Sequence, residues 1–478
     1  MNKKLSTFAC MFFLQLSSNN IFCMDALESP EFAFISDIRI NLDEINFKNI
    51  GSIDFNFDFF KKIVSMYCRS KLSYLSNSNE WMDSEKRGCP FCNEYDEFSG
   101  RCGTLISRKL AKECALHDIF YAQKLFIDQT TELNTISDLH ADFDALITIF
   151  NNMHNSGDID DNLIIKGNNF LIGLGDYVDR KNTSLRTLAF LLIIALKNPG
   201  RVILLRGNHE DLNINLTSPC INVEIESVFG KEFLEETYKL LVELYELMPS
   251  VLYVAQTNPH EEFNDFWIFS HALLDFKFDP SNFLDFNNSE LMKNGGKCFC
   301  IIEQNIFGCE DALDIPFDGY GFVWHDIGLK NSSSLEIDPR SNRHKYAPVF
   351  IKSFCRKYSN KWNVISGIVG GHDHYFAKHI YFIDRDFSTL RQEDFSREFT
   401  SAVGYINVTD NTDKGTMKVT MGLGSAKAGE ERCFTMVKFA SAPVARIAYE
   451  PTSLVIRREV ATDRMVWTYK VVEGVVES

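Results

Sequence analysis

The chain contains 478 residues, a length that suits either one enlarged domain with an appendage or two domains. Apolar residues make up 45% of it and charged residues 24%, which is typical of a folded protein with a large core and argues against intrinsic disorder. The formal net charge of −16 argues against a general nucleic-acid binder, because phosphate backbones are held by clustered Lys and Arg.

Residues 1–23 place two lysines ahead of an apolar stretch that runs from Leu5 to Leu16. This order resembles a secretory signal, but Ser6, Thr7 and Gln15 interrupt the stretch and no small-x-small cleavage site follows it. A cleaved signal and a retained apolar segment both stay open. No later apolar run approaches the ~20 residues that a membrane-spanning helix needs, so we expect no integral membrane span.

Residues 24–129 are mixed and polar, carry no catalytic motif and are predicted to form an N-terminal extension. They contain one group of metal-ligand residues, which comprises Cys89, Cys92, Cys102, Cys114 and His117. Thiolates and imidazole suit a tetrahedral structural zinc, formed by the CxxC pair with Cys114 and His117. The alternative is a set of unpaired thiols in a loop-rich subdomain. Most of the thirteen cysteines stand alone, which suits a reducing compartment better than a disulfide framework.

From residue 130 to residue 478 short apolar runs alternate with helix-length segments, the pattern of a layered α/β or α+β domain. Helices are predicted over 141–153, over 184–198 and between 227 and 248, an irregular insertion over 275–321, and further strands over 401–476. Five strands that run into polar clusters are predicted at the starts of LNTISDLH, NNFLIGLGDYVDR, RVILLRGNHED, DFWIFSHALL and VISGIVGGHDHY. Ends of neighbouring strands are where such folds place their ligands.

Ligand-type side chains collect at these five strand ends. Asp138 and His140 stand on alternate positions, so both side chains point to the same side and can grip one metal ion. The carboxylate of Asp176 can bridge two cations, as carboxylates do in two-metal hydrolases. Asn208, His271 and His372 would complete the coordination of a second ion. Each residue alone is an ordinary loop residue, but five such pieces in order predict a site for two divalent ions, and the mixed N/O ligand set suits Mn, Fe or Zn.

The segments DLH, GDYVDR, LLRGNHE, SHA and GHDH resemble the motif series of the calcineurin-like metallophosphatases. GDYVDR with LLRGNHE is similar to the phosphoprotein phosphatase branch of that superfamily. The resemblance implies a β-sandwich of two mixed sheets flanked by helices, with the N-terminal extension outside it. It implies that Asp138, His140 and Asp176 hold one metal, and that Asp176, Asn208, His271 and His372 hold the other. Mn²⁺ is the ion expected to support activity in vitro, with Fe or Zn as alternatives.

The resemblance also implies catalytic roles. A hydroxide between the ions would attack phosphorus in line, His209 would protonate the leaving oxygen, and Asp179 would orient His209. Arg180 would bind the phosphate, together with Arg340 or its competitor Arg343. His374, where protein phosphatases usually have no histidine, is a candidate seventh ligand. Lys181 stands where the branch usually has Gly, and it would either favour acidic substrates or only solvate a helix start.

The sequence therefore predicts a dinuclear-metal phosphomonoester hydrolase, foremost a protein phosphatase whose partner is a phosphorylated protein. Preference among phosphoserine, phosphothreonine and phosphotyrosine is left open, as is the oligomeric state. One alternative is hydrolysis of a small phosphodiester or a dinucleotide polyphosphate, which His374 favours, and another is a non-catalytic scaffold. The abundance of Phe, Asn, Lys and Ile resembles bacterial members of the branch, so a secreted or translocated effector that acts in a host cell is a further hypothesis, beside a cytoplasmic protein.

Overall fold

A computed structural model describes residues 41–47, 49, 53–75, 80–82, 120–128, 130–217, 219–256, 264–286, 296–302, 321–327, 336–337, 344–346, 348–360, 362–372, 378–383, 391–392, 399–401, 404–411, 416–423, 434–439, 452–461 and 464–473. The chain divides into two compact units, residues 1–44 and residues 45–478. The described part of the first unit contains the short helix η3 (Leu42–Glu44). All other elements belong to the second unit.

The first large sheet, sheet A, has eight strands and mixed direction. Its order is β13 (Arg391–Gln392), β12 (Lys378–Ile383), β17 (Phe434–Phe439), β11 (Asn363–Gly370), β6 (Asn264–Ser270), β5 (Val251–Gln256), β1 (Tyr121–Ile127) and β7 (Lys297–Ile301). The pairs β1/β5, β6/β11 and β11/β17 are parallel, and the other pairs are antiparallel. Parallel β6 and β11 therefore deliver their C-terminal residues to the same edge.

Sheet B also has eight strands. Its order is β14 (Phe399–Ser401), β15 (Gly404–Asn411), β16 (Thr416–Leu423), β19 (Arg464–Glu473), β18 (Thr452–Ala461), β2 (Glu132–Ile136), β3 (Phe170–Gly173) and β4 (Val202–Leu204). Strands β2, β3 and β4 are parallel, and the C-terminal strands of this sheet add an antiparallel extension. The strands predicted over residues 401–476 are thus present, but β17 of that span belongs to sheet A. A small third sheet joins β8 (Asp326–Ile327), β10 (His344–Tyr346) and β9 (Glu336–Ile337).

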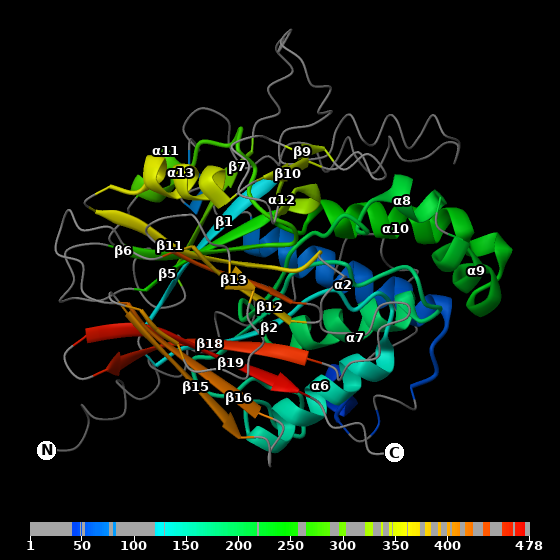
Figure 1. The fold of residues 1–478 in the computed structure, drawn as a ribbon. Coiled ribbons are helices and arrows are strands. Elements are labelled where there is room, and N and C mark those ends of the chain that lie inside the picture. Colours follow the sequence, from blue (N-terminus) through cyan, green and yellow to red (C-terminus); the bar gives the residue numbers. More distant parts are fainter. Residues whose placement is uncertain are drawn as a thin grey trace, which may run out of the picture. The chain divides into compact units, whose positions relative to one another are not determined.

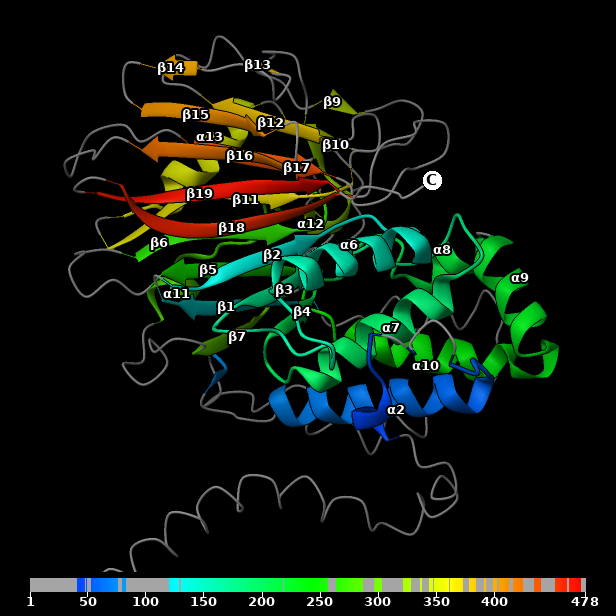
Figure 2. The ribbon, with the colours of Figure 1, turned by 90° about the horizontal axis from the view of Figure 1, so that it is seen from below.

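Sheets A and B lie face to face in both views of the ribbon (Figures 1 and 2). Main-chain hydrogen bonds join the loops that follow their parallel strands: the Leu174 N–H donates to the Ile136 carbonyl, and the Gly371 N–H donates to the His271 carbonyl. The expected sandwich of two mixed sheets flanked by helices is confirmed. The C-terminal strand ends of β2, β3 and β4 in one sheet and of β6 and β11 in the other meet at one place.

Helices cover the sandwich. After β2 comes α6 (Phe143–Ser156), whose first turn is capped by Asp142, and after β3 comes the largely buried α7 (Ser184–Lys197). The group α2 (Phe57–Leu75), α7 and α10 (Leu234–Glu246) lies together at one side (Figures 1 and 2). The other helices are α8 (Leu212–Thr217), α9 (Pro219–Val228), η6 (Lys231–Phe233), α11 (Ser281–Asp285), α12 (Gly321–Trp324) and α13 (Pro348–Tyr358).

The described residues refine three expectations from the sequence. The segment expected to be the N-terminal extension contains α2, which packs on α7 and α10, and β1, which lies inside sheet A between β5 and β7. The insertion over 275–321 contains α11 and the edge strand β7. The helix predicted between 227 and 248 begins at Leu234, because Gly230 with φ of 104° separates it from α9. None of the described helices is long and apolar enough to cross a membrane.

Candidate active site

The site lies where the loops after β2, β3, β4, β6 and β11 converge. Their backbone is unusual: among the described residues, seven other than glycine have positive φ, and six of them are in these loops. They are His140, Ala141, Asp176, Asp179, Arg180 and His372, with φ between 44° and 69°. Such conformations cost of order 1–3 kcal/mol each and persist where surrounding contacts hold them, typically at active sites.

Two glycines allow the loops after β3 and β4 to approach each other. Gly175 has φ of 104°, and a Cβ added there would collide with the backbone of Gly207. A Cβ on Gly207 would in turn collide with the amide nitrogen of Asp176. The sharp turn that the sequence predicted at Gly175 is therefore present, and it brings Asp176 beside the GNHE segment.

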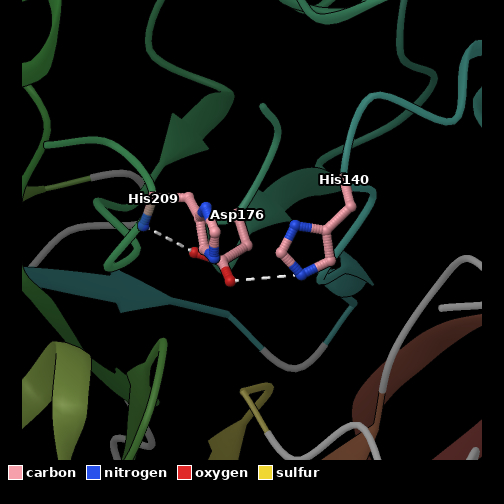
Figure 3. A group of neighbouring side chains, drawn as sticks. All are labelled: His140, Asp176 and His209. Carbon is pink, nitrogen blue, oxygen red and sulfur yellow. Dashed lines mark hydrogen bonds and ion pairs between the residues drawn. The ribbon is translucent and has the colours of Figure 1, made fainter. Parts of the chain in front are cut away.

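One cluster of metal-ligand atoms combines His140, Asp176 and His209, whose ligand atoms all lie within 4.8 Å of one another. Nε2 of His140 is 3.4 Å from Oδ2 of Asp176, and the backbone N–H of His209 donates to Oδ1 of Asp176 at 3.0 Å (Figure 3). His140 and Asp176 are buried.

A second cluster combines Asp176, His271 and His372 within the same distance limit. Nε2 of His271 lies 3.3 Å from Oδ1 of Asp176 and 3.0 Å from Nδ1 of His372. The terminal amide atom of Asn208 that faces these groups lies 2.9 Å from Nε2 of His271 and 3.0 Å from Nδ1 of His372. Asp176 thus stands between the two clusters, in the position that a bridging ligand requires.

Asp138 lies at the same strand ends but belongs to neither cluster. Its carboxylate is fully buried, accepts the backbone N–H of His372 at 2.9 and 3.1 Å and accepts the hydroxyl of Ser137. A Cβ at Gly371 would collide with the side chains of Ser137 and Asp138, so a glycine at this position allows the loops after β2 and β11 to stay in contact. Asp138 therefore positions His372, and its role as a ligand stays a prediction.

The donor set fits divalent cations. Nδ1 of His140 faces the Val178 carbonyl at 3.3 Å, and Nδ1 of His271 faces the Leu174 carbonyl at 3.1 Å. A proton on Nδ1 satisfies each carbonyl and leaves the Nε2 lone pair for a metal, as is usual for metal-binding histidines. If the Asn208 oxygen points at the histidines and at Asp176, it faces only acceptors. A cation between these atoms removes that conflict.

Electrostatics favour a cation at the same place. Burial raises the pKa of Asp176, but the neighbouring His271, His209 and His140 together lower it well below its usual range. Burial raises the pKa of Asp138 to about 6, with His271 and Asp176 acting in opposite directions. Two carboxylates in a buried site cost much less when positive charge compensates them.

His209 forms a couple with Asp179. Its Nδ1 lies 2.9 Å from Oδ2 of the buried Asp179, and its Nε2 lies 3.4 Å from Nη2 of Arg180. Burial alone lowers the pKa of His209, but the charge of Asp176 and the hydrogen bond to Asp179 outweigh it, so the pKa is raised above its usual value. The arrangement places an imidazole that is bonded to a carboxylate beside a guanidinium.

Glu210 is a site residue to which the sequence analysis assigned no role. Its buried carboxylate accepts three backbone N–H groups, from Asp176 at 2.7 Å, Tyr177 at 2.8 Å and Gly207 at 2.9 Å. It therefore clamps the loop after β3 to the loop after β4. Its position directly after Asn208 and His209 did not indicate this role.

Asp326 was noted only as part of the segment VWHD. Its Oδ1 lies 3.6 Å from Nε2 of His372, where a carboxylate can orient a ligand histidine. Lys181 forms an ion pair with Asp142, the residue that caps α6, so its charge is partly compensated within the protein. The contact is at the start of α6 and not of α7, which follows Lys181 in the chain, so both interpretations of Lys181 stay predictions. The remaining predicted residues lie outside the described part of the chain: His374, Arg340, Arg343, Cys89, Cys92, Cys102, Cys114 and His117.

The sequence profile described as "Calcineurin-like phosphoesterase" matches residues 135–376, just over half of the chain, and this segment contains every residue of the two clusters. The chain belongs to the calcineurin-like phosphoesterase family. Members of this family use divalent metal ions, which agrees with the ligand clusters described above. The motif resemblance that the sequence alone suggested is thereby confirmed.

Similar named proteins belong to the phosphoprotein phosphatase branch of the family. A candidate serine/threonine-protein phosphatase of Schizosaccharomyces pombe is 33% identical over 113 residues, 23% of this chain and 32% of that protein. The PP2A-like serine/threonine-protein phosphatase PPG1 of Saccharomyces cerevisiae is 32% identical over 111 residues, 22% of this chain and 27% of that protein. The matched segments thus span about a third or less of these relatives. A solved S. cerevisiae serine/threonine phosphatase structure, described as similar to human phosphatase PP5, aligns with 14% identity and a TM-score of 0.37, covering 77% of this chain and 98% of that one.

Proposed function

We propose that this family member is a dinuclear-metal phosphomonoester hydrolase that removes phosphate from protein side chains. The observation that carries the proposal is the position of Asp176, whose carboxylate stands between His140 on one side and His271 on the other. His209, Asp179 and Arg180 lie directly beside this pair of clusters. A metal site alone would serve many functions, whereas a metal site flanked by a carboxylate-bound imidazole and a guanidinium suits phosphate transfer to water.

The residues would share the work as follows. Asp176, His140, Asn208, His271 and His372 would hold two divalent ions, with Asp138 as a further ligand of the first. Such ions, when bound, neutralise phosphate charge and lower the pKa of bound water towards neutrality.

Arg180 would bind non-bridging phosphate oxygens through its planar guanidinium. As the P–O bond breaks, Nε2 of His209 would donate its proton to the leaving oxygen. Asp179, hydrogen-bonded at Nδ1, would stabilise the resulting imidazole in the orientation needed for the next turnover.

His209 also belongs to the first ligand cluster, so a second role for it must be considered. Because its Nδ1 is bonded to Asp179, only Nε2 could bind a metal, and a metal-bound Nε2 could not donate a proton. The neighbouring Arg180 makes Nε2 a poor place for a cation. We therefore assign His209 to proton donation and Asp138 to the first ion.

The protein substrate is supported by the GDYVDR and LLRGNHE segments and by relatives that are named serine/threonine-protein phosphatases. Purified protein, reconstituted with Mn²⁺, should release phosphate from phosphoserine, phosphothreonine or phosphotyrosine peptides and from p-nitrophenyl phosphate. The same preparation should act at least tenfold more slowly on bis-p-nitrophenyl phosphate and on a dinucleotide polyphosphate.

If the diester or the dinucleotide is hydrolysed faster than the phosphopeptides, the result would favour the alternative function, hydrolysis of a small phosphodiester or a dinucleotide polyphosphate. Protein that binds no metal and is inert towards the phosphopeptides and the three small substrates would instead indicate a non-catalytic scaffold. The peptide comparison within the same experiment also ranks the three phosphorylated side chains, which neither the motifs nor the ligand geometry distinguishes.

A further inference from the structure

The His209–Asp179 couple is contacted by a third buried side chain, Asn215 of α8. The Nδ2 amide of Asn215 donates to Oδ2 of Asp179 at 2.9 Å and to the backbone carbonyl of His209 at 2.9 Å. One amide group thus holds both members of the couple, from a residue that is itself fully buried. The sequence marks no motif at this position.

A tyrosine holds the other end of that amide, whose orientation is set by its two acceptors. The hydroxyl of Tyr245, which is buried in α10, donates to Oδ1 of Asn215 at 3.0 Å. If the amide were turned over, its oxygen would face Oδ2 of Asp179 and the His209 carbonyl, which are both acceptors, and its nitrogen would face the tyrosine hydroxyl. The chain of donors therefore runs in one direction, from Tyr245 through Asn215 to Asp179.

Asp179 depends on this chain because its other contacts are few. Within the described part of the chain its second carboxylate oxygen, Oδ1, is buried and has no hydrogen-bond partner. Its backbone is in the left-handed region with φ of 68°, a conformation that needs support from its surroundings. The amide of Asn215 is thus the contact that holds the Asp179 carboxylate in the rotation that places one oxygen against the ring of His209.

We propose that Asn215 and Tyr245 are positioning residues that hold Asp179 and His209 in the geometry for proton donation to the leaving group. This inference rests on the proposed function. It adds two residues outside the metal site that act on the leaving-group step and not on phosphate binding or metal binding.

The leaving group provides the test, because an alkoxide needs a proton when it departs and p-nitrophenolate hardly does. In Tyr245→Phe, kcat for a phosphoserine peptide should fall about tenfold, a fraction of what general acid catalysis contributes, while kcat for p-nitrophenyl phosphate should stay within about twofold. KM and bound metal should be unchanged. Asn215→Leu, which is nearly isosteric, should show the same selectivity with a larger loss.

Tyr238→Phe is the matched control. Tyr238 lies on the same helix and is equally buried, but within the described residues its hydroxyl has no hydrogen-bond partner. This variant should match the wild type with both substrates. If Tyr245→Phe slows both substrates equally, or neither, the inference is overturned, because a purely structural contact would not distinguish the leaving groups.

A measurement without turnover separates this inference from the proposed function. In metal-free protein with ¹⁵N-labelled histidine, the Nδ1 proton of His209, assigned by its loss in His209→Gln, should broaden in Tyr245→Phe and stay sharp in Tyr238→Phe. An unchanged signal in Tyr245→Phe overturns the positioning role even if the enzyme is active. Wild-type protein that hydrolyses neither substrate would refute the proposed function, and the NMR comparison would still decide the positioning role.

Discussion

The clamp formed by Glu210 allows a quantitative prediction. Glu210→Gln keeps the shape of the side chain but replaces one carboxylate oxygen by an NH₂ group. Oε2 accepts from the backbone N–H groups of Asp176 and Gly207, and Oε1 accepts from that of Tyr177. If the amide oxygen takes the place of Oε2, the NH₂ group faces the Tyr177 N–H, and two donors then meet in a buried site.

An unsatisfied buried donor costs about 1–3 kcal/mol, and two charge-assisted hydrogen bonds become neutral ones. We expect Glu210→Gln to lower the free energy of unfolding by about 2–4 kcal/mol, and so to lower the melting temperature of a unit of this size by about 2–4 °C. Burial together with the charge of Asp176 raises the pKa of Glu210 to about 7, so at pH 8 the wild-type carboxylate is ionised but its charge itself costs folding free energy. The comparison therefore belongs at pH 8 in Mn²⁺-loaded protein, where divalent ions would compensate the charge of Asp176.

Differential scanning calorimetry and metal analysis of the same samples provide the assay. Because the clamp holds the backbone of Asp176, bound metal should fall together with stability. Glu226→Gln is the control, since that glutamate is exposed on α9. A Glu210→Gln protein that melts within about 1 °C of wild type and keeps its metal would refute the role assigned to the carboxylate.

Three further outcomes are expected. Asp176→Asn should abolish phosphatase activity and reduce bound metal by more than half, because it removes the charge shared by both clusters; full metal content measured by plasma mass spectrometry would contradict the bridging role. His209→Ala should lower kcat about 10²–10³-fold with metal content intact, and loss of one ion per chain would instead make His209 a ligand. Burial, with Lys297 nearby, lowers the pKa of Lys71 to about 7, so above this pH the unfolded chain holds a proton that the folded protein has lost. The free energy of unfolding of the wild type, relative to that of Lys71→Met, should therefore rise between pH 7 and 10 by about 1.4 kcal/mol per pH unit. Urea unfolding at each pH gives both free energies, and a difference between the two proteins that does not change with pH would refute the prediction.

The sequence alone determined the five strand ends, because polar ligand residues after short apolar runs are a local signal. It also indicated the family, since GDYVDR and LLRGNHE are contiguous segments. It could not assign β1 and β7 to sheet A, because strand pairing across about 175 residues leaves no local pattern. The edge strand β7 lies within a span that reads as irregular from its residues alone.

The tertiary structure decided which groups meet. His271 and His372 are 101 residues apart, yet their ring nitrogens lie 3.0 Å from each other, because parallel strands bring their C-terminal ends to one edge. Glu210, Asn215 and Tyr245 carry no sequence signal for their roles, since a hydrogen bond to a backbone amide or to a second side chain depends on orientation and burial. The candidate ligands of the site were thus readable from the chain, whereas the residues that hold those side chains in position became visible only when the chain was folded.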